Sequence, residues 1–213
     1  MRRFPGDLET LDALLLVHGD AERLRAIVRA TNEANRIVSG MRLNSAGGNL
    51  LESVELAAIV KQAKISTVVA NGATCASACF VVFAAGYEKF ASYSAQIGVH
   101  GASDQSGRET VASGAATVSM ARIVNQLGVP AGVVGKMVVT PPIEMVWLVP
   151  DDLRSMNVTL TGKPNQLAVP PVANTPQQIL PPDTQAKKPE PTWKDIVRAG
   201  PGILHRALSG ISA

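Results

Sequence analysis

The stretch Ala70-Asn71-Gly72-Ala73-Thr74-Cys75-Ala76-Ser77-Ala78-Cys79-Phe80 joins two apolar segments through a glycine and a block of very small residues. The run before it, Ile65–Ala70, is typical of a strand, and the run after it, Phe80–Ala85, is typical of a helix. We therefore predict a tight strand-to-helix turn with Ser77 in the first turn of the helix. Unpaired backbone N–H groups at such a position favour a developing oxyanion.

A glycine-rich loop upstream supplies further backbone donors. The segment Asn44-Ser45-Ala46-Gly47-Gly48 follows an apolar run and precedes an amphipathic one. Paired glycines permit positive φ and a close approach of the backbone to another group. We predict that the N–H groups of Gly48 and Ala78 together form an oxyanion hole.

A histidine completes a nucleophile and base pair. His100 follows the strand-like run Gln96–Val99 and lies 23 residues after Ser77, across one helix and a pair of strands. Ser77 is thus a candidate nucleophile and His100 its candidate base. Each residue also has a non-catalytic alternative. Ser77 would occupy the turn only because a small residue fits there, and His100 would only hydrogen-bond a loop carbonyl.

In this order, the three motifs resemble the proteolytic subunit of Clp protease and its relatives in the ClpP/crotonase superfamily, over about Leu11 to Thr161. The Cys-Ala-Ser-Ala-Cys form of the serine motif is more similar to a bacterial branch described as predicted periplasmic proteins of ClpP-like fold. The resemblance implies a serine peptidase acting on peptide or protein substrates. It also implies a homo-oligomer, with the segment Glu109–Leu127 as a possible contact, although the long ring-stacking insertion of Clp subunits has no counterpart.

The third catalytic position departs from the family pattern. In Clp proteases an acid precedes an aromatic residue that leads into a short helix, which Trp147-Leu148-Val149-Pro150 resembles. The position that aligns best holds Met145, so Glu144 is the nearest candidate, with Asp104 and Asp151 as alternatives. A Ser-His dyad and a triad both stay open.

Strands and helices alternate through the first three quarters of the chain, which predicts an α/β fold of stacked βαβ units. In such a sheet the loops at the carboxyl ends of the strands form the site. Expected helices cover 21–39, 50–63, 77–85, 109–127, 131–138 and 150–154, and expected strands cover 14–17, 37–43, 65–70, 89–90, 96–99 and 145–148.

Composition limits the chemistry. The net charge of +3 argues neither for nor against nucleic acid, and the sequence shows no interleaving of aromatic and basic residues of the RNA-binding kind, so no nucleic-acid partner is expected. His18, His100 and His205 are too scattered for a zinc site, so neither a metal nor a cofactor is expected. Cys75 and Cys79 are four residues apart, which permits a disulfide or two small buried thiols.

The two ends of the chain differ in composition from its central part. We predict a domain over 1–162, a Pro-rich linker over 163–191, where eight of the fourteen prolines lie, and a weak amphipathic tail or marginal helix over 192–213. No apolar run is long enough to span a membrane. No apolar core follows the basic start, so the sequence as given predicts a cytoplasmic protein, or a periplasmic one if a signal peptide precedes it.

Two functions follow from the sequence. The first is a serine peptidase with a Ser-His dyad or triad and a backbone oxyanion hole. The second is a non-catalytic ClpP-like module that recruits partners, because a fold alone does not establish activity.

Overall fold

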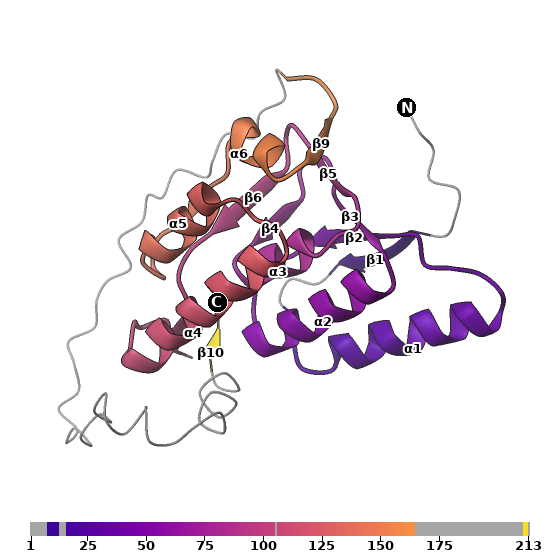
Figure 1. Cartoon of the computed structure of the whole chain (residues 1–213), viewed down its shortest axis with the longest axis horizontal. Coiled ribbons are helices and arrows are strands. Elements are labelled where there is room, and N and C mark those ends of the chain that lie inside the picture. Colours follow the sequence, from indigo (N-terminus) through magenta and orange to yellow (C-terminus); the bar gives the residue numbers. More distant parts are fainter. Residues whose placement is uncertain (1–7, 13–15, 105, 165–210, 213) are drawn as a thin grey trace.

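The computed structural model describes residues 8–12, 16–104, 106–164 and 211–212. Figure 1 shows the arrangement of its helices and strands. The helices are α1 (Asp20–Glu33), α2 (Leu50–Gln62), α3 (Ala78–Ala84), α4 (Val111–Gln126), α5 (Ala131–Val139) and α6 (Pro150–Ser155). The strands are β1 (Leu8–Asp12), β2 (Gly40–Asn44), β3 (Ser66–Val69), β4 (Thr74–Ala76), β5 (Lys89–Ser92), β6 (Gln96–Val99), β7 (Ser103–Asp104), β8 (Val146–Trp147), β9 (Val158–Thr161) and β10 (Ile211–Ser212).

A five-stranded parallel sheet is the main layer. Its strand order is β1-β2-β3-β5-β9, and every neighbouring pair is parallel. The alternation of strands and helices in the sequence predicted this class of fold, since parallel neighbours need a crossover between them. The predicted α/β fold is confirmed.

A second, smaller sheet carries the segments that the sequence analysis singled out. It has the order β4-β6-β8, with β4 parallel and β8 antiparallel to β6. Two isolated parallel bridges extend it, one between Ser45 and Cys75 and one between Leu16 and Gly48. Each strand of the main sheet from β1 to β5 is therefore followed by a short segment in this second layer and then by a helix (Figure 1).

The helices pack in sequence order, α1 on α2, α2 on α3 and α3 on α4, as Figure 1 shows. Helix α3 lies at the centre, and all seven of its residues are buried. Its Phe80 and Phe83 are the largest fully buried side chains. The serine-bearing segment therefore leads directly into the buried centre of the core.

Capping residues set the helix ends. The Asn49 side chain accepts the N–H of Glu52 at the start of α2, and Thr110 forms a capping box with Ser113 at the start of α4. Helix α1 ends at Glu33, well before the predicted Ser39, because Asn35 adopts a left-handed φ of 55° that closes the helix.

The structure corrects the sequence prediction around Ser77. The small-residue block is not one turn, because Thr74–Ala76 forms the strand β4 before the helix. Helix α3 begins at Ala78, so Ser77 stands immediately before the helix and not inside its first turn. Two of the four residues of the predicted strand over 14–17 lie outside the described residues, and of the other two Leu16 forms an isolated bridge; β1 and β9 were not predicted.

The chain ends lie largely outside the described residues, including the predicted Pro-rich linker and most of the predicted tail. Two tail residues, Ile211 and Ser212, form β10, which pairs antiparallel with β7 in the register Ile211 to Asp104 and Ser212 to Ser103. These two residues are extended, and the prediction for the tail as a whole stays a prediction. Among the helices that the structure describes, none is long and apolar enough to cross a membrane.

Candidate active site

Ser77 adopts a backbone conformation that L-residues rarely take. Its φ is 56° and its ψ is −124°, the values of the first central residue of a type II′ turn, a position dominated by glycine. Such a conformation costs a residue with a side chain of the order of 1–3 kcal/mol. The conformation turns the chain sharply from β4 into α3, as a nucleophile elbow does.

Helix termination explains the other residues of this kind. Among the described residues, the non-glycine residues with positive φ are Asn35, Lys64, Ser77 and Asn157. Three of them directly follow the last turn of α1, α2 or α6, where a left-handed residue commonly ends a helix. Ser77 alone precedes a helix, so its strain needs a different reason.

Two segments flank Ser77 in the second layer. On one side its N–H donates to the carbonyl of Gly98 at 3.0 Å, two residues before His100. On the other side, Ala76 N–H donates to the Ser45 carbonyl at 3.1 Å, which aligns the glycine loop with the serine turn. The three motifs, far apart in sequence, therefore run side by side.

The glycine loop has a shape that requires glycine. Gly47 and Gly48 have φ values of 121° and 132°. A Cβ on Gly48 would lie 2.4 Å from the backbone oxygen of Leu16, closer than atoms can approach. The Ser45 hydroxyl donates to the Gly47 carbonyl and accepts the Gly47 N–H, each at 3.2 Å, which fixes the loop from inside.

One backbone N–H group of the serine turn and one of the glycine loop are unbonded among the described residues. Neither Gly48 nor Ala78 donates its N–H to another of the described residues. Ala78 directly follows Ser77, and Gly48 lies on the flanking loop. These are the two donors that the sequence analysis predicted for an oxyanion hole, and that role stays a prediction.

His100 bonds a loop carbonyl, which is the non-catalytic alternative that the sequence analysis left open, and its catalytic role stays a prediction. Its Nδ1 lies 2.7 Å from the carbonyl oxygen of Gly101. A carbonyl only accepts hydrogen bonds, so Nδ1 carries the proton and Nε2 keeps its lone pair. Burial lowers the pKa of His100, and the bond to Gly101 opposes this effect in part. The imidazole is therefore neutral at neutral pH, in the tautomer that can accept a proton at Nε2.

Both side chains are enclosed. Ser77 is 3% exposed and His100 is 8% exposed. The Ser77 Oγ is buried and has no hydrogen-bond partner among the described residues. The hydroxyl and the imidazole are thus not joined in this state, and a substrate needs the enclosing residues to move.

The candidate acids are directed elsewhere. Glu144 is exposed, and no ion pair joins it to His100 among the described residues. Hydrogen bonds from Ser106, with further bonds and the charge from Arg108, lower the pKa of Asp104, whose carboxylate is engaged by these two residues. Asp151 pairs with Arg154 at 2.6 Å. The Gly101 carbonyl occupies the place of an acid at Nδ1, and a backbone group leaves no trace in a sequence.

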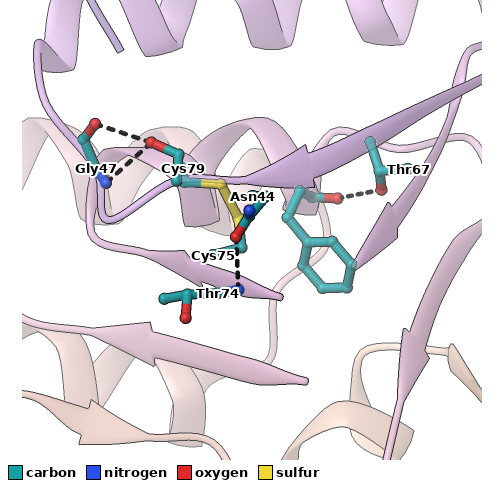
Figure 2. Close-up of a disulfide and its surroundings, with 8 residues drawn as sticks. Asn44, Gly47, Thr67, Thr74, Cys75 and Cys79 are labelled. Atoms are coloured by element: carbon teal, nitrogen blue, oxygen red, sulfur yellow. Dashed lines mark hydrogen bonds between the residues drawn. A yellow bond between two sulfur atoms is a disulfide. The ribbon is translucent and has the colours of Figure 1, made fainter. Parts of the chain in front are cut away.

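Cys75 and Cys79 form a disulfide that encloses the serine turn (Figure 2). Both are fully buried, Cys75 in β4 and Cys79 in α3. Figure 2 also shows the Asn44 side chain accepting the N–H of Thr74 at 3.1 Å, just before Cys75. The end of β2 is therefore tied to the strand that leads into Ser77.

A cavity of about 270 Å³ adjoins the histidine side of the site. Its lining includes Gly101, Thr117, Val118 and Val139. Val139 is 77% exposed and Ile143, nearby on the chain, is 86% exposed. Within the described ranges, no three His, Cys, Asp or Glu side chains gather closely enough to hold a metal ion.

Comparison with known proteins shows the fold. No protein-family profile matches the chain, and no curated protein matches it. Among solved structures, it is similar to a mutant of a protein described as "1510-N membrane-bound stomatin-specific protease", with a TM-score of 0.54 and 15% sequence identity. The match covers 72% of this chain and 77% of that one. The chain therefore has a ClpP-like α/β fold of the kind found in that protease.

Proposed function

We propose that the protein is a serine peptidase of the ClpP-like type, in which Ser77 attacks a peptide carbonyl. The observation that carries the proposal is the strained backbone of Ser77 at the junction of β4 and α3. A glycine would fit this conformation without strain, yet the position holds a residue with a hydroxyl. Strained residues of this kind cluster at active sites, which supports a functional role for the Ser77 side chain.

His100 is the general base in this proposal. Its Nε2 takes the Ser77 proton as the hydroxyl oxygen bonds the carbonyl carbon, and the same nitrogen later gives the proton to the leaving amine. The Gly101 carbonyl holds the required tautomer and stabilises the imidazolium, which supports a Ser-His dyad over a triad with Glu144. Side chains of a dyad often stand apart in the free enzyme and meet in the substrate complex.

The N–H groups of Gly48 and Ala78 bind the oxyanion. Each lacks an acceptor among the described residues; Ala78 follows Ser77 directly, and Gly48 lies three residues after Ser45, which bridges Cys75. A lost donor of this kind costs roughly 10²–10³-fold in turnover. Substitution at Gly48 is not a clean test of its N–H, because any side chain there meets the Leu16 backbone.

A fluorophosphonate tests the proposal, since this reagent bonds an activated serine. We expect labelling of the wild-type protein, mapped to Ser77 by mass spectrometry. Ser77→Ala should abolish labelling, and His100→Gln should slow it by orders of magnitude, because an unassisted hydroxyl is a poor nucleophile. Ser92→Ala is the matched control, since it removes another buried serine and should label normally.

The second candidate is the non-catalytic interaction module. The enclosed Ser77 and the exposed apolar side chains of Val139 and Ile143 favour it. Folded wild-type protein that neither labels at Ser77 nor cleaves unstructured peptides in any oligomeric form would establish this candidate and end the peptidase proposal.

A further inference from the structure

The disulfide closes around the strained residue. Cys75 lies on one side of the turn and Cys79 on the other, so the covalent ring contains the Ser77 backbone. A ring this short removes little chain entropy from the unfolded state, compared with a ring of tens of residues. Its main effect is therefore local, on the shape of the turn.

The pairing of β4 and the burial of α3 hold the two ends of the turn, but few described interactions act on Ser77 itself. The Ser77 N–H bonds the Gly98 carbonyl, and the Ser77 carbonyl accepts the N–H of Phe80 at 2.9 Å. The Ser77 hydroxyl has no partner among the described residues, so the side chain contributes no bond that fixes the backbone. A residue without such support relaxes toward ordinary φ values unless its neighbours prevent it.

We propose that the Cys75–Cys79 disulfide is the positioning element that keeps Ser77 strained, so that the oxidation state of this pair regulates the site. A dithiol reduces the pair by two electrons: the S–S bond breaks, each cysteine sulfur gains a proton, and the dithiol becomes a cyclic disulfide. The turn then relaxes, and the Ser77 hydroxyl and Ala78 N–H lose their alignment. The effect on activity rests on the proposed peptidase function, whereas the effect on the turn does not.

The first experiment measures the turn without using catalysis. Full-length Ser77→Gly and Ser77→Ala proteins are equilibrated with reduced and oxidised dithiothreitol, and the thiols are counted. Glycine tolerates the strained conformation and alanine does not, so strain released on reduction makes the Ser77→Ala disulfide easier to reduce. We expect a difference of roughly 5-fold to 100-fold between the two equilibrium constants.

Lys64 supplies the matched control. It also has a positive φ, 53°, but it lies at the end of α2, away from the disulfide. Lys64→Gly and Lys64→Ala should therefore give equal reduction constants. Equal constants for the two Ser77 variants would overturn the proposal, because the turn then persists without the bond. The proposal would also be overturned if the glycine and alanine variants differed in their reduction constants as much at Lys64 as at Ser77, because the disulfide would then stabilise the whole fold.

The second experiment measures the consequence for the site. Wild-type protein is labelled with fluorophosphonate while oxidised, after reduction, and after reoxidation, with circular dichroism as the check on folding. We expect labelling of Ser77 to fall at least about tenfold on reduction, as misplaced catalytic groups lose rate, and to recover on reoxidation. The variant Cys75→Ala/Cys79→Ala should match the reduced protein. Equal labelling in all states would overturn the regulatory role, whereas no labelling in any state would refute the peptidase function and leave the first experiment decisive for the turn.

Discussion

The glycine loop at the end of β2 and the serine turn at the end of β4 both connect a strand to a helix, but they use different residues to make the bend. Both bend the chain between a strand and a helix through positive φ values, 132° at Gly48 and 56° at Ser77. Gly48 removes the side chain, which lets the Leu16 backbone approach. Ser77 keeps a side chain and lies inside a disulfide ring.

The difference separates two uses of a strained turn. Where only backbone N–H and C=O groups are needed, glycine adopts the conformation with no steric cost. Where a hydroxyl is needed at the turn itself, the surrounding structure has to hold the strained residue. The predictions below test this contrast, from the largest expected effect to the smallest.

The largest loss of folding stability is expected on substitution of Gly48. In Gly48→Ala the new Cβ meets the backbone oxygen of Leu16 at 2.4 Å and its nitrogen at 2.7 Å, so the bridge between the two segments has to open. We expect a loss of about 3 kcal/mol or more in the free energy of unfolding, measured with urea. Gly72→Ala is the control, because its φ of 72° is strained but no atom lies within 4 Å of the new Cβ. It should cost about 1 kcal/mol, and equal losses at the two glycines would contradict the close approach.

A smaller loss of stability is expected on substitution of Glu52, which lies in α2 just after the glycine loop. This buried carboxylate accepts the N–H groups of Gly19 at 3.1 Å and Ala21 at 2.6 Å, and so caps α1 from α2. Glu52→Ala leaves both donors unsatisfied and should lower the free energy of unfolding by about 2 kcal/mol. The exposed Glu55 on the same helix is the control, and Glu55→Ala should stay within about 0.5 kcal/mol of wild type. A Glu52→Ala protein as stable as the control would show that water replaces the cap.

Asn44 links the two regions, and its loss should cost less. Its side chain accepts the N–H of Thr74 at 3.1 Å at an exposed position. Asn44→Ala should cost about 1 kcal/mol in unfolding free energy. It should also slow Ser77 labelling more than Arg42→Ala does, since Arg42 is an exposed residue on the same strand. Identical labelling in the two variants would mean that this link does not position the serine turn.

The smallest change in folding stability is expected from the titration of His100 as the pH is lowered. Burial lowers the pKa of His100 below its usual 6.5, so the unfolded chain binds this proton more readily than the folded one. Stability is therefore unaffected well above pH 6.5 and falls as the pH drops from 6.5 toward the folded pKa. Urea midpoints between pH 7.5 and 5.5 should decline more in wild type than in His100→Gln, and parallel declines would contradict the burial effect.

The sequence by itself determined the fold class and the segments of interest. Alternating strands and helices predicted the parallel sheet, because only crossovers join parallel strands. Small residues around Ser77 and paired glycines at Gly47 and Gly48 marked the places where the chain bends sharply. These are local properties of the residues, which a sequence states directly.

Tertiary structure decided the rest through contacts between distant segments. The strand β4 was not predicted, because Thr74–Ala76 is held by neighbours from β2 and β6 and not by its own apolarity. The sequence suggested a carboxylate partner for His100, but the Gly101 carbonyl takes that place in the structure. It also left the thiols and the disulfide of Cys75 and Cys79 as equal alternatives. Backbone carbonyls, bridge registers and the distance between two sulfurs depend on how the chain is folded in space, so no residue type encodes them.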